Sequence, residues 1–344
     1  VAGAPANIEL VANPSSAPAD GSTEVRVTAT VRDAQGNAVP RVQVQFSATP
    51  SLTITPSVAV TDDTGQATVS VLAPTQAGVY TLQARVGSVA RSVALTFTAG
   101  SAATLTLSAS RTDLLVSLPP TYGATDYSSL LPLSTTEIRA TVVDSNGNRI
   151  PNVVVQFVAS AGTIQRTAIT DNSGVASVIY IAPVGPPGTV IINANAGTAQ
   201  QSLSLNILPG PAARVRVTAS PLVLPMNGRS QSQVDAYVFD ANGNTVSDGT
   251  IVTFQLNPSI GRLLQNDVPT TGGKATTFYI APATADVAEV TVNAVARSVV
   301  SGTSFQTDPN DPFSQPKVAI TLGGQIQIDR TSFSPEIAVS SSDG

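Results

Sequence analysis

The sequence has no cysteine, no histidine and no tryptophan among its 344 residues, and only 4% of it is aromatic. Without histidine and cysteine it lacks the commonest general base, the thiol nucleophile and most transition-metal ligands. Lysine occurs only at Lys274 and Lys317, and glutamate is also scarce, whereas helix surfaces normally draw on both residues. These absences predict a protein that is neither an enzyme nor helical.

Charge and long apolar runs are also missing. Charged residues make up 11% of the chain, the formal net charge is −5, and the few arginines are scattered, so no basic stripe is available to neutralise phosphates. No stretch of 18 or more apolar residues is present to cross a membrane as a helix, and no glycine-rich phosphate loop occurs. We therefore expect no nucleic-acid partner, no membrane span in this segment and no cofactor.

The sequence does contain many short strands with small β-branched cores. Apolar and polar residues alternate from Val25 to Val31 and again from Val42 to Phe46, which places one face inward and the other in water. Turn residues separate these runs at the spacing typical of sandwiches. The predicted fold class is all-β, with several tandem sandwiches.

The chain repeats itself three times. VRDAQGNAVPRVQVQF returns as VVDSNGNRIPNVVVQF and again as VFDANGNTVSDGTIVTFQ, and their aspartates, Asp33, Asp144 and Asp240, are 111 and 96 residues apart. A second marker ends at Pro74, Pro183 and Pro282, with spacings of 109 and 99. A short alternating strand after a glycine-containing junction opens each unit. The predicted division is 1–3 as the end of a preceding repeat or a linker, then repeats at 4–100, 101–210 and 211–324, and 325–344 as an extra strand.

The first marker has a mechanical interpretation. Its aspartate side chain caps the turn and its glycine supplies a positive φ, so we predict a structural hairpin turn. The turn residues are Asp33, Gly36 and Asn37, then Asp144, Gly147 and Asn148, then Asp240, Gly243 and Asn244. An alternative is a calcium site that joins Asp33 and Asn37 to Asp62 or Asp63, because clustered oxygens suit that ion. The third repeat weakens this alternative, since it has Thr270-Thr271-Gly272-Gly273 at the equivalent loop.

Taken together, these markers resemble the bacterial immunoglobulin-like group 1 domain, the repeat of intimin- and invasin-type adhesin arms. The segment from Val31 to Phe46, its two counterparts and the stretches around Gly65 and Gly174 carry the resemblance. It implies an immunoglobulin-like sandwich, export to the bacterial cell surface and a part in cell adhesion, but no particular ligand. The absence of cysteine and tryptophan excludes the antibody-type disulfide and buried tryptophan.

Two insertions interrupt the repeats, at 118–134 in the second and at 300–316 in the third. They concentrate rare aromatic residues in loops, where such residues are either covered by their own sandwich or serve as contacts for a partner. The predicted contact residues are Tyr122, Tyr127, Leu130, Leu131, Phe305 and Phe313. Convergence of the two loops on one exposed surface would instead indicate a binding module. Asp308, Asn310 and Asp311 are a weaker alternative as a calcium site.

The segment 325–344 separates two functions. If it opens another repeat, the chain is a stalk segment of a surface adhesin, and the short junctions make it an extended rod with further repeats as neighbours and a host or neighbouring-cell receptor at the tip. If it donates a strand to an identical subunit, the chain is a subunit of an extracellular filament. Ile326, Ile328 and Ile337 would then contact the partner. The stalk is the favoured prediction.

Overall fold

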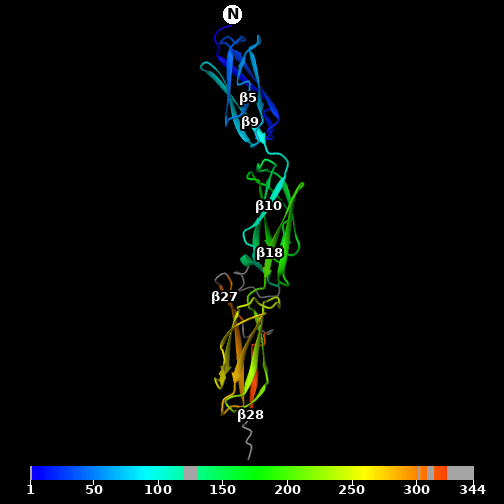
Figure 1. Ribbon diagram of the computed structural model, residues 1–344, viewed down its shortest axis with the longest axis vertical. Coiled ribbons are helices and arrows are strands. Elements are labelled where there is room, and N and C mark those ends of the chain that lie inside the picture. The colour runs from blue at the N-terminus through cyan, green and yellow to red at the C-terminus, as the bar shows by residue number, and fades with distance from the viewer. Residues whose placement is uncertain (1, 120–130, 301–302, 308–313, 324–344) are drawn as a thin grey trace, which may run out of the picture. The chain divides into compact units, whose positions relative to one another are not determined.

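The computed structural model describes residues 2–119, 131–300, 303–307 and 314–323 (Figure 1). Within these ranges the chain is built of strands, apart from a short 3-10 helix, η1 (Leu131–Leu133). The strands form six sheets, which pair into three immunoglobulin-like sandwiches. The predicted all-β fold class is confirmed. Among the described residues, no helix is long and apolar enough to cross a membrane.

By compactness the chain divides into two units. The first comprises Val1–Thr112, Thr135–Ile181 and Thr189–Leu205, and the second comprises Asp113–Ser134, Ala182–Gly188 and Asn206–Gly344. The first unit includes the first sandwich and most strands of the second. The second unit includes the third sandwich and those loops and strand residues of the second sandwich that are not in the first unit.

The first sandwich consists of a four-stranded and a five-stranded sheet. In order across the sheet, the first has β1 (Asn7–Asn13), β3 (Glu24–Arg32), β7 (Gln66–Leu72) and β5 (Thr53–Thr55). The second has β2 (Ser16–Pro18), β9 (Val89–Thr98), β8 (Gly78–Val86), β4 (Gln43–Thr49) and β6 (Val58–Val60). Strands β2 and β9 are parallel, whereas the other pairs are antiparallel.

The other two sandwiches repeat this strand order. The second has β10 (Thr104–Ala109), β12 (Thr135–Val143), β16 (Val175–Ile181) and β14 (Thr163–Ile164) in one sheet, and β11 (Asp113–Leu115), β18 (Ala199–Leu208), β17 (Gly188–Ala196), β13 (Val154–Ala159) and β15 (Thr167–Ile169) in the other. The third has β19 (Arg214–Ser220), β21 (Gln231–Phe239), β25 (Lys274–Ile280) and β23 (Arg262–Leu263), and β20 (Val223–Pro225), β28 (Lys317–Gly323), β26 (Glu289–Val300), β22 (Ile251–Asn257) and β24 (Asp267–Pro269). An extra strand, β27 (Thr303–Gln306), pairs with β26.

The alternating residues supply the core, as period two requires. Val27 and Ala29 of β3 are fully buried, and Phe46 on the facing sheet is 3% exposed. The matching phenylalanines, Phe157 and Phe254, are buried in the second and third sandwiches. Because successive side chains of a strand alternate between core and solvent, these strands bury small apolar residues and leave threonine, glutamine and arginine in water.

The turn after β3 differs from the predicted hairpin. It closes a single bridge, between Arg32 and Ala38, and the chain then passes from the sheet of β3 to the sheet of β4. The same bridge occurs between Val143 and Arg149 and between Phe239 and Thr245. The turn is therefore a corner between two sheets, because β4 pairs with β6 and β8 rather than with β3. This position leaves the turn at one end of each sandwich.

Candidate functional site

The three corner turns, residues 33–37, 144–148 and 240–244, share one hydrogen-bond pattern. Asp144 Oδ1 accepts from the backbone N–H groups of Asn146 and Asn148, both at 2.9 Å, and Asp144 Oδ2 accepts from Asn148 Nδ2 at 2.9 Å. Asp33 and Asp240 make the same three bonds within their own turns at 2.8 to 3.1 Å. One aspartate thus accepts the hydrogen bonds that close each turn.

Each turn also needs its glycine. Gly36, Gly147 and Gly243 have φ values of 83°, 82° and 85°, a left-handed conformation that side-chain-bearing residues resist. A Cβ atom at any of these glycines would meet nothing within 4 Å, so backbone conformation rather than crowding selects glycine here.

The same carboxylates hold the chain that enters each repeat. Asp144 Oδ2 accepts from the backbone N–H of Gly100 at 2.8 Å. The equivalent bonds run from Gly3 to Asp33 and from Gly210 to Asp240, both at 2.9 Å. Because these glycines lie directly before the repeats, each aspartate ties the incoming linker to its own turn. A carboxylate with a full set of N–H donors gives a stronger anchor than neutral acceptors do.

At the first internal junction, the turn 144–148 also contacts the preceding repeat. Asn146 Nδ2 donates to the carbonyl oxygen of Ala19 at 3.0 Å, and Asn148 Nδ2 donates to that of Thr75 at 2.9 Å. The backbone N–H of Ala77 donates to Asn148 Oδ1 at 2.8 Å. Asn148 therefore bonds to its own turn and to the preceding repeat at the same time.

At the second internal junction, the turn 240–244 repeats these contacts. Asn242 Nδ2 donates to the carbonyl of Ser117 at 2.9 Å, and Asn244 Nδ2 donates to that of Gly185 at 2.8 Å. Ser117 follows β11 just as Ala19 follows β2, and Gly185 follows Pro183 much as Thr75 follows Pro74. The two asparagines of the turn thus reach the same two loops of a sandwich at both internal junctions.

The electrostatics of the first two turns favour ionised aspartates. The backbone N–H of Gly3 and the side-chain amide of Asn37 lower the pKa of Asp33 to about 2. For Asp144, burial raises the pKa, but the hydrogen bonds from Asn148 and Gly100 outweigh this, so its pKa lies below the ordinary value of 3.8. Both residues are only 4% exposed, so hydrogen bonds in place of water keep their carboxylates charged.

Two carboxylates of the alternative calcium site, those of Asp33 and Asp62, accept hydrogen bonds within their own turns. Asp62 Oδ1 accepts from the backbone N–H groups of Thr64 and Gln66 and from the Thr64 hydroxyl at 2.6 to 2.9 Å. The carboxylates of Asp33 and Asp62 are thus occupied by hydrogen-bond donors. Within the described ranges, no group of three acidic, histidine or cysteine residues is positioned to hold a metal ion.

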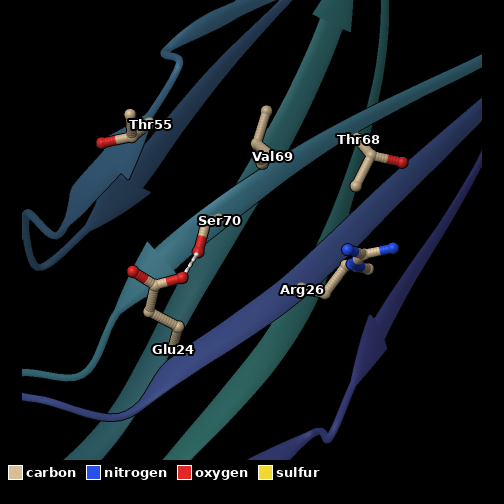
Figure 2. A pocket seen from close by; sticks show the side chains of 6 residues that line it. All are labelled: Glu24, Arg26, Thr55, Thr68, Val69 and Ser70. Carbon is tan, nitrogen blue, oxygen red and sulfur yellow. Dashed lines mark hydrogen bonds between the residues drawn. The ribbon is translucent and has the colours of Figure 1, made fainter.

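The outer face of the first sandwich has a shallow depression of about 280 Å³ (Figure 2). Glu24 and Arg26 of β3, Thr55 of β5, and Thr68 and Ser70 of β7 line it. The Ser70 hydroxyl donates to Glu24 Oε2 at 2.7 Å, an exposed cross-strand bond. A nucleophile needs an adjacent base that a third group orients. In this depression the Ser70 hydroxyl is bonded directly to a carboxylate in solvent, which is not the arrangement of an activated nucleophile.

Most predicted contact residues lie outside the described ranges. These are Tyr122, Tyr127, Leu130, Phe313, Ile326, Ile328 and Ile337, together with Asp308, Asn310 and Asp311 of the weaker calcium alternative. Leu131 begins η1 and is 63% exposed, and the backbone of Phe305 lies in β27 opposite Ser298. Leu133 is buried against Leu115. The predicted loop contacts therefore remain predictions.

Sequence reasoning missed the role of the asparagines before the turn glycines. Asn146 and Asn242 were absent from the predicted turn residues, and Asn148 and Asn244 were predicted to stabilise only their own turns. A signal was present, because both internal turns read Asn-Gly-Asn whereas the first reads Gln35-Gly36-Asn37. The sequence does not show which loops of one sandwich meet the turn of the next, so it does not show what this difference does.

Residues 7–98 match the sequence model of the bacterial Ig-like domain, group 1. The first repeat is a domain of this group. The group 1 domain resemblance therefore holds for the first sandwich, where the strands β1 to β9 span the matched residues. The inverse autotransporter adhesin YeeJ of Escherichia coli strain K12 is 28% identical over 273 residues, which are 76% of this chain. The chain spans only 11% of the length of that relative.

Solved adhesin structures share the fold. FdeC of Escherichia coli, described as a broadly conserved adhesin, superposes with a TM-score of 0.65 at 15% identity and covers 94% of this chain and 100% of its own. InvD of Yersinia pseudotuberculosis has a TM-score of 0.57 at 20% identity and covers 93% of this chain and 98% of its own. The kinship with adhesin repeats confirms the prediction that this chain is not an enzyme.

Proposed function

We propose that this chain is a structural stalk segment of a large extracellular bacterial surface adhesin and that it holds a binding tip away from the cell. The observation that carries this proposal is the pair of asparagine amides that bonds each internal turn to the preceding repeat. A spacer needs junctions that resist bending, and these contacts lie at the two internal junctions.

The strength of a junction follows from its bonds. At the first junction, three bonds cross between the turn and the preceding repeat, and each contributes about 0.5 to 1.5 kcal/mol. The linker adds no slack, because Gly100 is bonded to Asp144 directly after β9 ends at Thr98. A short tethered linker keeps the effective concentration of the two surfaces high, so weak bonds suffice to limit bending.

The proposal includes the division into repeats at 4–100, 101–210 and 211–324, a location at the bacterial cell surface and an extended rod of repeats. The partners within the stalk are neighbouring repeats, and a host or neighbouring-cell receptor would bind at a tip. The filament alternative depends on strand donation by residues 325–344, which lie outside the described ranges. Nothing in the described residues favours it.

Pulsed electron paramagnetic resonance tests the stalk directly, because the chain has no cysteine of its own and spin labels attach only where cysteines are introduced. Ser92 in β9 and Gln201 in β18 are exposed, and a cysteine pair there spans the first junction. We expect one narrow distance distribution, which broadens in the double variant Asn146→Ala, Asn148→Ala. A broad distribution in the unaltered chain would refute a stiff stalk.

A further inference from the structure

Asn-Gly pairs occur at three places in the sequence, Asn146-Gly147, Asn227-Gly228 and Asn242-Gly243. Such a pair is open to deamidation, because glycine has no side chain to keep its backbone nitrogen away from the side chain of the asparagine. The first and third pairs lie in the turns of the internal junctions, where the asparagine amide contacts the preceding repeat. A reaction at these two asparagines therefore acts on the junctions themselves.

We propose that Asn146 and Asn242 are deamidation sites, that the closed junction protects them, and that their deamidation releases the junction irreversibly. In the reaction, the deprotonated backbone nitrogen of the glycine attacks Cγ of the asparagine, a cyclic succinimide forms, and the side-chain nitrogen leaves as ammonia. Water then opens the ring at either carbonyl, which gives aspartate or isoaspartate. Overall, the amide and water become a carboxylic acid and ammonia. The release of the junction rests on the proposed stalk function, whereas the reaction itself does not.

The closed first junction holds both reacting groups. Asn146 Nδ2 donates to the carbonyl oxygen of Ala19 at 3.0 Å, and the Gly147 N–H donates to the carbonyl oxygen of Asp144 at 3.1 Å. Attack requires the nitrogen of Gly147 to lose its proton and Cγ of Asn146 to turn towards that nitrogen. The two hydrogen bonds oppose these changes, so the reaction proceeds from the opened junction and its rate follows the population of the open state.

The second junction holds its asparagine in the same way. Asn242 Nδ2 donates to the carbonyl oxygen of Ser117 at 2.9 Å, and the Gly243 N–H donates to that of Asp240 at 3.1 Å. Asn242 Oδ1 is buried and has no hydrogen-bond partner among the residues that the structure describes. The site therefore accommodates a neutral amide that donates, and it lacks the donors that a buried carboxylate needs.

Deamidation turns the junction contact from attractive to repulsive. An ionised carboxylate only accepts hydrogen bonds, so its oxygen would face a main-chain carbonyl oxygen with no proton between them. The new charge also lies two residues from Asp144 or Asp240, whose carboxylates are already buried in the turns. Isoaspartate additionally lengthens the backbone between the N–H groups of Asn146 and Asn148, which bond to the same carboxylate oxygen. Either product therefore keeps the contact from forming again.

The remaining pair, Asn227-Gly228, provides a control within the chain, because an aspartate fits its place. Asn227 Oδ1 accepts from the backbone N–H groups two and three residues further on, at 2.9 and 2.7 Å. In the first repeat the equivalent residue is Asp20, whose Oδ1 accepts from the corresponding N–H groups at 2.8 and 2.7 Å. Conversion of Asn227 to aspartate therefore keeps these bonds, whereas the same conversion at Asn146 removes one.

Peptide mass spectrometry of the full chain tests whether the junction controls the reaction. Folded chain and chain unfolded in guanidinium chloride are incubated in mildly alkaline buffer, and the conversion of amide to acid is followed at Asn146, Asn227 and Asn242. We expect Asn146 and Asn242 to react at least about five-fold more slowly in the folded chain. Asn148→Ala, which removes two contacts of the first junction, should accelerate the reaction at Asn146 but not at Asn242, and Asn244→Ala should do the reverse. Equal rates in folded and unfolded chain, or no acceleration in either variant, would overturn the proposal.

The variant Asn146→Asp tests whether the product releases the junction. With spin labels on Ser92→Cys and Gln201→Cys, we expect a broader distance distribution in Asn146→Asp than in the unaltered chain. Asn227→Asp adds the same charge where aspartate fits, so it should change neither the distribution nor the urea midpoint. Urea unfolding of Asn146→Asp shows that this variant folds.

The two readouts separate this inference from the stalk. If the distribution is narrow in the unaltered chain and stays narrow in Asn146→Asp, the release is refuted and the stalk stands. If the distribution is broad in the unaltered chain, the stalk and the release both fail, and the rates measured by mass spectrometry still decide whether the junction protects its asparagines.

Discussion

The replacement Asn148→Ala isolates the coupling between two repeats, because Asn37, at the equivalent position of the first repeat, provides a matched control. The side chain of Asn148 makes one bond within its turn and two with the preceding repeat, to Thr75 and from Ala77. Asn37 makes the bond within its turn, to Asp33. Since each bond contributes about 0.5 to 1.5 kcal/mol, the loss of stability in Asn148→Ala should exceed that in Asn37→Ala by about 1 to 3 kcal/mol.

Amide hydrogen exchange at Ala77 measures this difference at the junction itself. The Ala77 N–H donates to Asn148 Oδ1 at 2.8 Å, so its exchange reports opening of the contact rather than global unfolding. In Asn148→Ala we expect exchange at Ala77 to accelerate about 5- to 150-fold, which corresponds to 1 to 3 kcal/mol of coupling. In Asn37→Ala it should not change. Equal acceleration in both variants, or none in Asn148→Ala, would refute this coupling.

Three further predictions concern single positions. Gly162 has a φ of 80°, and a Cβ atom there would lie 2.6 Å from Tyr180 Oη, so Gly162→Ala should lower the free energy of unfolding by roughly 2 kcal/mol or more. The open position Gly147, replaced by alanine, should lose only about 1 kcal/mol in the same urea titration. The pKa of Asp33 is lowered to about 2, so the stability that its carboxylate gives the folded state is complete above pH 3.8 and is lost as the pH falls towards 2. Asp33→Asn should therefore flatten the dependence of the urea midpoint on pH in that window. Burial raises the pKa of Tyr180 to about 12, so stability should fall as the pH rises from 10 towards 12, and Tyr180→Phe should remove that fall.

The strands and turns were predictable because their signals are local. Alternation from Val25 to Val31 follows from the pleat of a strand, which sends successive side chains to opposite faces. The turn glycines follow from a positive φ that only glycine adopts without cost. The two markers recur three times with matching spacings, so they are not a chance pattern. The fold class followed from these repeats rather than from any one motif.

Local sequence signals did not predict that the turn is a corner between two sheets. Val31 to Phe46 has the pattern of a hairpin, since two alternating runs flank a tight turn. In the structure the second run pairs with β6 and β8 instead of with β3. The choice between pairing within one sheet and crossing to the other depends on which strands are already adjacent, and this is a property of the whole sandwich.

The sequence alone thus determined the all-β class, because the alternation that marks a strand depends on neighbours a few residues apart. Only the tertiary structure decided what the asparagine side chains bind. Asn146 and Ala19 are 127 residues apart, and Asn242 and Ser117 are 125 apart. Such partners meet because the end of one folded sandwich presents main-chain carbonyls to the turn of the next, and a main-chain carbonyl is present at every residue and so leaves no mark in the sequence.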